Sequence, residues 1–142
     1  MRDFRSVIDI NAPAERVWAI MSDVERWPEW TASMARVERL DLGALGVGSR
    51  VRVKQPKLAQ ALFEITAWEP GRGFDWITRS AVVTAVARHV IAPSGTGVRV
   101  TLSVDYSGPL SGVIGWLYGG LTNRYMAMEA EGLKRRAEAP PI

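Results

Sequence analysis

The chain has no cysteine and only one histidine, His89, among its 142 residues. The lack of cysteine excludes disulfides, thiolate catalysis and thiolate metal sites. One histidine without a cluster of acidic residues around it in the sequence supplies too few ligands for a zinc or transition-metal site. We therefore expect neither a bound metal nor another cofactor.

The chain also lacks a long hydrophobic run. The least polar stretch, residues 109–121, is rich in glycine and shorter than the ~20 residues that a membrane-spanning helix needs. The first ten residues, MRDFRSVIDI, mix charged and apolar side chains and do not form the apolar centre of a signal peptide. These observations predict a cytoplasmic protein.

Blocks of like charge are almost absent, although the net charge is +3 and the calculated pI about 9.7. Most arginines stand singly among acidic residues, and the one basic run is Lys134–Arg136. It lies near the end of an expected helix, where cations complement the helix dipole. No zinc-finger, RNP or helix-turn-helix pattern accompanies it, and neither GVGSR nor GRG is a phosphate-binding loop. We expect no nucleic-acid partner.

What is present is typical of one soluble domain spanning residues 1–142. The composition is 47% hydrophobic and 23% charged, with no repeat and no linker-like segment. Alternating apolar residues and turn signals predict a short strand, a short helical region that begins near Asn11 and breaks before Pro28, six more strands and one long helix. The predicted strands cover residues 4–10, 34–42, 49–55, 60–69, 73–80, 83–92 and 97–107, and the long helix covers 109–137.

Charged residues mark the solvent face of most strands, so their neighbours are assigned to the inner face. The segment 34–42 does not alternate clearly and stays unassigned. Glu64, Asp75 and Asp105 all fall on the outer face, which predicts no inward carboxylate. The inward set is Val51, Val53, Gln55, Phe63, Ile65, Ala67, Phe74, Trp76, Thr78, Ala85, Ala87, His89, Ile91, Val100, Leu102, Val104 and Tyr106.

The long helix carries an unusual number of glycines in its first half, namely Gly112, Gly115, Gly119 and Gly120. Each lowers helix stability by up to ~1 kcal/mol relative to alanine. The facing strand residues Ala85 and Ala87 are also small. Two explanations are open: space for a ligand between helix and sheet, or close packing of a kinked helix.

Several segments resemble the SRPBCC superfamily, and more narrowly its bacterial polyketide cyclase/dehydrase-like branch. They are NAPAERVW, DVERWPEW, GVGSRVRVKQPKL, ITAWEPGRGFDW, GTGVRVTLSVDYSGPL and AEGLKRR, which together span essentially the whole chain. The branch is related to START lipid-transfer domains and to the birch pollen allergen. The resemblance implies an α+β helix-grip fold: a curved seven-stranded antiparallel sheet wrapped around a long C-terminal helix, two short helices after strand 1, and an internal hydrophobic cavity. It brings no fixed set of catalytic residues.

An internal cavity would turn part of the inward set into a binding surface. His89 is the one candidate general acid or base, with Tyr106, Thr78 or Gln55 as possible polar partners. Trp18 and Trp68 are interpreted as structural, whereas Trp27 either joins the short helices to the sheet or lies at the mouth of the cavity. The predicted ligand-binding residues are Trp30, Val53, Gln55, Phe63, Trp76, Thr78, Ala87, His89, Tyr106, Ile114, Leu117 and Leu121.

Three hypotheses for function follow. The leading one is a protein that binds or carries a hydrophobic or amphipathic small molecule, such as a lipid, polyketide, isoprenoid or aromatic compound. The second is a polyketide cyclase or dehydratase that uses His89 as general acid/base. The third is a module of the quinone-chaperone kind that contacts a membrane or protein through Trp116 and the arginine-rich surface.

Overall fold

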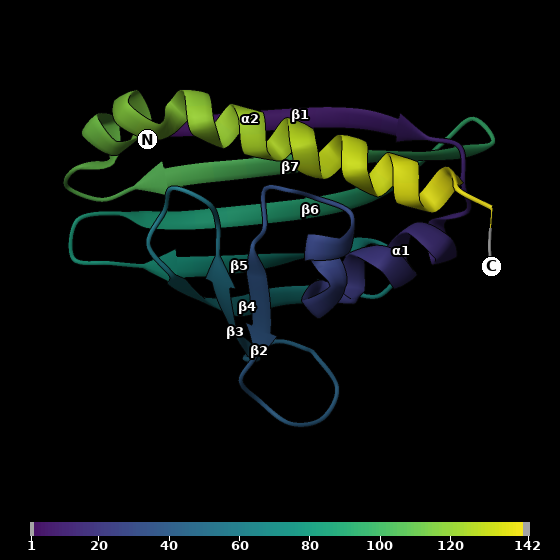
Figure 1. Ribbon diagram of the computed structural model, residues 1–142, viewed down its shortest axis with the longest axis horizontal. Helices are drawn as coiled ribbons and strands as arrows, with labels where there is room; N and C mark the ends of the chain where they lie inside the picture. The colour runs from purple at the N-terminus through teal and green to yellow at the C-terminus, as the bar shows by residue number, and fades with distance from the viewer. Residues whose placement is uncertain (1, 141–142) are drawn as a thin grey trace.

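One antiparallel sheet and one long helix make up most of the molecule, which a computed structural model describes for residues 2–140 (Figure 1). The sheet order is β1-β7-β6-β5-β4-β3-β2. The helix α2 runs across the sheet, and the short helices α1 and η1 lie beside its C-terminal half. The elements are β1 Arg2–Ile10, α1 Ala14–Ser22, η1 Val24–Glu29, β2 Arg36–Arg39, β3 Arg50–Lys54, β4 Ala61–Glu69, β5 Gly73–Arg79, β6 Thr84–Ser94, β7 Gly97–Ser107 and α2 Ser111–Glu138.

The predicted α+β class, the seven antiparallel strands, the two short helices and the long C-terminal helix are confirmed. Two boundaries differ. The strand expected at 34–42 is only Arg36–Arg39, at the edge of the sheet, where it pairs with β3 alone. The long helix begins at Ser111 and not at Pro109, because the Leu110 amide donates to the carbonyl of Val82 in the β5–β6 loop before the helix starts.

The inward assignment of Ala67 is wrong, and a β-bulge is the reason. The β4–β5 register shifts between Ile65 and Ala67, which places an extra residue in β4 and reverses the faces beyond it. Ala67 therefore pairs with the outward Asp75, while Trp68 pairs with the buried Phe74 and contacts its ring, with centroids 5.5 Å apart. Strict alternation cannot detect such an insertion.

The C-terminal end of α2 is fastened to α1 by one side chain. Arg16 donates hydrogen bonds from its guanidinium group to the carbonyl oxygens of Ala137 (2.6 Å), Ala139 (2.9 Å) and Arg136 (3.3 Å). The last carbonyls of a helix have no partner within the helix and carry its negative dipole end, so a cation is well placed there. This contact fixes where α2 crosses the sheet.

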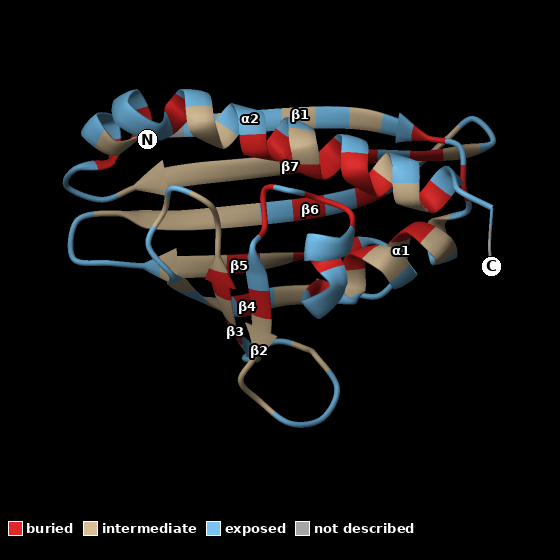
Figure 2. Cartoon of the chain, viewed as in Figure 1, coloured by how far each residue is buried: buried red, intermediate tan, exposed pale blue. Residues whose placement is uncertain are grey.

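Burial differs between the two halves of the sheet (Figure 2). The strand segments nearest α1 are buried, whereas the ends of β5, β6 and β7 near the start of α2 are mostly half-buried. The filled half holds the fully buried side chains, among them Ile10, Val17, Met21, Val24, Trp27, Val51, Ile65, Phe74, Val100 and Leu133. The interior of the other half is only partly filled by the protein's own side chains.

Candidate ligand-binding cavity

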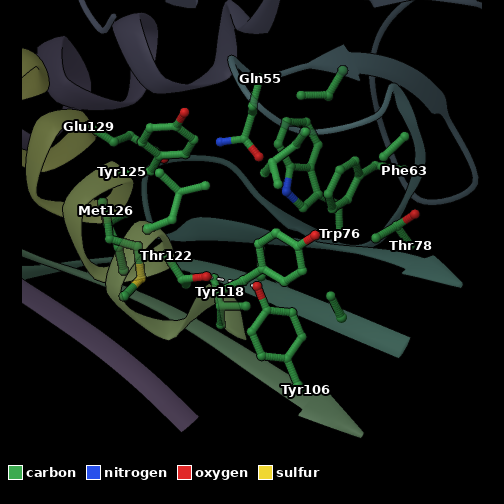
Figure 3. A pocket seen from close by; sticks show the side chains of 18 of the residues that line it. Gln55, Phe63, Trp76, Thr78, Tyr106, Tyr118, Thr122, Tyr125, Met126 and Glu129 are labelled. Carbon is green, nitrogen blue, oxygen red and sulfur yellow. Dashed lines mark hydrogen bonds between the residues drawn. The ribbon is translucent and has the colours of Figure 1, made fainter. Parts of the chain in front are cut away.

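A cavity of about 300 Å³ occupies the space between α2 and the inner face of the sheet, the face turned towards α2. Figure 3 shows side chains of α2, among them Thr122, Tyr125 and Met126, lying opposite strand side chains such as Phe63 and Trp76. Most of the lining is aliphatic or aromatic. The apolar and aromatic residues around it include Trp27, Met34, Val53, Leu58, Phe63, Trp76, Ala85, Ala87, Leu102, Val104, Tyr106, Ile114, Tyr118, Leu121, Tyr125 and Met126.

Ten of the twelve residues proposed from the sequence as ligand contacts line this cavity. They are Val53, Gln55, Phe63, Trp76, Thr78, Ala87, His89, Tyr106, Ile114 and Leu121. The other two lie elsewhere. Leu117 is 58% exposed on the outer side of α2, and Trp30 is buried against Gly132, beyond the cavity lining. Whether the ten bind a ligand remains a prediction.

Gly112, Gly119 and Gly120 do not create this space, which corrects the expectation based on them. A Cβ built on Gly112 or Gly120 meets no atom within 4 Å, and both residues are exposed at the surface of α2. A Cβ on Gly119 would lie 3.0 Å from the ring of Phe4, so this glycine permits close packing of α2 on β1. The space arises instead over the strands, where the small Ala85 and Ala87 line the cavity.

One end of the cavity holds two buried ionisable side chains, His89 from β6 and Glu129 from α2. His89 Nε2 lies 3.4 Å from Glu129 Oε1, and the two residues are only 4% and 8% exposed. On the other side of the ring, His89 Nδ1 lies 3.1 Å from the carbonyl oxygen of Phe74. We call these two residues the His89–Glu129 pair.

Sequence analysis missed Glu129, and its prediction of no inward carboxylate is wrong. That prediction considered the strands alone. Glu129 lies four residues after Tyr125 and eight after Leu121, both of which line the cavity, so helical spacing places it on the same face. The same spacing would have identified Tyr118 and Thr122, which also line the cavity.

Aromatic rings surround His89. Phe74, its partner across β5 and β6, stacks on the imidazole with centroids 4.3 Å apart and planes at 14°. Trp27 and Trp76 approach with centroids 5.4 Å and 5.6 Å away, both edge to face. These contacts hold the ring in one orientation, so Nε2 is directed at Glu129.

Three other polar side chains of the lining, Tyr106, Thr122 and Tyr125, are engaged with one another or with the backbone. Tyr106 and Thr122 share a hydrogen bond of 2.8 Å between their hydroxyl groups, and Tyr125 donates to the carbonyl of Pro56. The sequence suggested Tyr106, Thr78 or Gln55 as partners of His89. The structure gives His89 the Phe74 carbonyl and Glu129 instead.

The opposite end of the cavity lies near the start of α2. Its lining includes Val83, Ile114 and Tyr118, of which Tyr118 is 39% exposed. Ala85 and His89 are four residues apart on β6, which spans about 13 Å of strand. The cavity thus extends from the side chains near the start of α2 to the His89–Glu129 pair.

Charged groups near the pair lie on the outer face of the sheet. Arg88 forms ion pairs with Asp105 (2.5 Å) and Asp75 (3.6 Å) on neighbouring strands. Burial raises the pKa of Asp75, and the nearby Arg88 and His89 oppose that rise. Within residues 2–140 no three histidine or acidic side chains are grouped closely enough to hold a metal ion. Across the same residues, no helix combines the length and apolarity that a membrane crossing requires.

An antiparallel seven-stranded sheet that holds a long C-terminal helix over an apolar cavity is a helix-grip fold. The aromatase/cyclase Zhui from Streptomyces sp. R1128 has a TM-score of 0.80 at 16% identity, covering 96% of this chain and 93% of that one. Protein TTHA0849 from Thermus thermophilus has 0.77 at 21% identity, covering 96% and 97%. Ara h 8.0201 has 0.70 at 12% identity, also covering 96% and 97%. At these identities the likeness establishes the fold.

The family is established by the sequence itself. Residues 1–138 match the family model described as polyketide cyclase / dehydrase and lipid transport. The chain therefore belongs to this family, in agreement with the SRPBCC resemblance. No curated protein matches the sequence.

Proposed function

We propose that the protein binds one compact hydrophobic small molecule, aromatic or polycyclic, in the cavity between α2 and the sheet. The single observation that carries this proposal is the partly empty interior of about 300 Å³, bordered largely by apolar and aromatic side chains. Protein interiors normally pack to a density near ~0.75 without such voids. Membership of a family that includes cyclases and lipid-transport proteins supports the same function.

The size and lining of the cavity narrow the class of ligand. Ligand pockets commonly enclose ~300–1,000 Å³, so this one lies at the lower end of the range. A molecule of one to three rings fits within this volume. Removal of apolar surface from water, at ~25 cal/mol per Å², supplies most of the affinity.

The test is a titration with N-phenyl-1-naphthylamine, an apolar dye that becomes fluorescent on leaving water. We expect saturable one-to-one binding that 2-methylnaphthalene displaces. Ala87→Phe places a ring in the cavity and weakens binding at least about tenfold, because the ligand and the new side chain compete for one space. The matched control is Ala127→Phe on the exposed side of α2, which leaves the affinity unchanged. Unsaturable binding by the wild type would contradict the proposal.

A second candidate function is cyclisation or dehydration of a polyketide-like substrate with His89 as proton donor and acceptor. The observation that favours it is Glu129, which stands at the distance of an ion pair from His89 Nε2 inside the cavity. The test is incubation with β-hydroxyketone substrates and detection of water loss by mass spectrometry. His89→Gln must abolish turnover although the variant still binds the dye saturably. Equal turnover by this variant would remove the candidate.

A further inference from the structure

We infer that the His89–Glu129 pair holds one shared proton and that Glu129 accepts a hydrogen bond from a hydroxyl group of the ligand. This inference rests on the proposed binding function and names the ligand class more closely, as a hydroxylated aromatic compound. The inference follows from the positions of His89 Nδ1, His89 Nε2 and the Glu129 carboxylate.

The first step fixes the proton on Nδ1. The Phe74 carbonyl oxygen, 3.1 Å from His89 Nδ1, can only accept a hydrogen bond. Nδ1 therefore carries a hydrogen. The stacked Phe74 ring and the edges of Trp27 and Trp76 hold the plane of the imidazole in place.

The second step concerns Nε2. A neutral imidazole protonated at Nδ1 directs a lone pair from Nε2 towards Glu129 Oε1, only 3.4 Å away. With an ionised Glu129, two electron-rich atoms would face each other in a buried site, which is unfavourable. One more proton between them removes this conflict, either on Nε2 as imidazolium or on Glu129 as carboxylic acid. Both forms leave the pair without net charge.

The third step identifies the atom that meets the ligand. Within residues 2–140 the Glu129 carboxylate has His89 as its one polar side-chain partner, and Glu129 lines the cavity. Its second oxygen therefore lacks a donor from the described chain. The neighbouring charges on β5, β6 and β7, namely Asp75, Arg88 and Asp105, are engaged with one another on the outer face. The two buried residues of η1, Val24 and Trp27, are uncharged, so η1 brings no charged side chain to the pair.

A ligand hydroxyl satisfies this oxygen better than other common groups. An ether or carbonyl oxygen brings no hydrogen to donate. When the shared proton is on Nε2, an ammonium group would meet a positive imidazolium, whereas a hydroxyl group would donate to an ionised carboxylate, and such hydrogen bonds are about twice as strong as those between neutral groups. A ligand with a phenol or enol hydroxyl on a ring system matches the site, because the hydroxyl donates to Glu129 and the rings pack against the aromatic lining.

The experiment compares three probes of similar size: 2-naphthol, 2-methoxynaphthalene and 2-methylnaphthalene. We expect the wild type to bind 2-naphthol about tenfold or more tightly than the other two. In Glu129→Gln a neutral amide replaces the carboxylate, so the preference falls to about threefold or less. The control Glu131→Gln makes the same charge change on the exposed side of α2 and keeps the full preference.

Two outcomes separate this inference from the function on which it rests. If all three probes bind equally well, or if 2-methoxynaphthalene equals 2-naphthol, the inference is wrong and the binding function stands. If none binds saturably, both are wrong.

A ligand-free measurement tests the first step, the hydrogen on Nδ1, by itself. Because His89 is the only histidine, nitrogen-15 NMR of the imidazole has no assignment ambiguity. We expect a hydrogen on Nδ1 at neutral pH. A neutral ring protonated only at Nε2 would overturn the inference.

Discussion

Gly132 of α2 and Trp30 after η1 approach so closely that a side chain would not fit between them. A Cβ built on Gly132 would lie 2.0 Å from the carbonyl oxygen of Trp30 and 3.1 Å from its indole ring. The glycine therefore sets how near the C-terminal half of α2 comes to the chain that follows α1 and η1. Because of this close approach, side chains fill the interior beneath the C-terminal half of α2. The cavity lies in the other half of the interior, towards the start of α2.

We predict that Gly132→Ala lowers the free energy of unfolding by about 1–3 kcal/mol, since the backbone of Trp30 must move to admit the methyl group. Gly120→Ala, in the same helix, has no atom within 4 Å of its Cβ. It should raise the free energy of unfolding by up to ~1 kcal/mol through helix propensity. Urea denaturation of both variants measures the difference. Equal effects would contradict the close approach.

The two tryptophans of the WPEW segment should respond differently to truncation. Trp27 Nε1 donates to the Met21 carbonyl at 3.0 Å in a fully buried site. Trp27→Phe leaves that carbonyl unpaired, which adds about 1–3 kcal/mol to the lost packing. In the described chain the buried Trp30 Nε1 has no partner, so Trp30→Phe loses packing alone. Thermal and urea unfolding should rank Trp27→Phe as the more destabilising, and the reverse order would be inconsistent with the structure.

Arg16 should stabilise the protein through the end of α2. Arg16→Met keeps the apolar stem but removes the donors to three terminal carbonyls, and we expect a loss of about 1.5–3 kcal/mol. Arg26→Met removes an exposed ion pair to Asp23 and should cost less than about 1 kcal/mol. Amide hydrogen exchange should also show faster exchange in the last turns of α2 in Arg16→Met only. Similar losses in both variants would contradict the assigned contact.

Glu138 makes the free energy of unfolding depend on pH in the acidic range. A hydrogen bond from Lys134, and a second from the Asn11 amide, lower the pKa of Glu138 below its ordinary value of 4.5. A lowered folded-state pKa contributes stability above pH ~4.5, and this contribution disappears as pH falls through the folded-state value.

We therefore predict that Glu138→Gln is less stable than wild type near pH 6 and that the difference vanishes in acid. Denaturation at a series of pH values between 2 and 7 measures it. Lys134→Met should weaken the same pH dependence, because it removes the largest cause of the shift. A difference that grows on acidification would have the wrong sign.

Most of the fold could be predicted from the sequence because one face of the sheet is buried. Arg50, Arg52, Arg88 and Arg99 alternate with inward residues, and this alternation alone locates β3, β6 and β7. The bulge in β4 could not be predicted, since an inserted residue leaves no mark in composition. The start of α2 was misplaced because a tertiary hydrogen bond, from Leu110 to Val82, decides it.

The candidate site was predicted less completely than the fold. Strand periodicity located Trp76, Ala87 and His89, each of which lines the cavity. Glu129, the partner of His89, was not predicted. The rotation of α2 about its own axis decides which residues face the sheet, and that rotation depends on contacts such as Gly132 with Trp30, which lie 102 positions apart in the sequence. Helical spacing from Leu121 and Tyr125 separates Glu129 from Glu131, but a glutamate on a helix is usually solvent-exposed, so the assignment of charged residues to the solvent face led away from it.

The most direct test of the central claim, that the interior beneath α2 is ligand space, is isothermal titration calorimetry with 2-methylnaphthalene at several temperatures. The account predicts one site per chain, a negative heat-capacity change from apolar burial, and loss of both in Ala87→Phe but not in Ala127→Phe. A wild type that gives no saturable heat at any temperature, or an Ala87→Phe variant that binds as the wild type does, would contradict it.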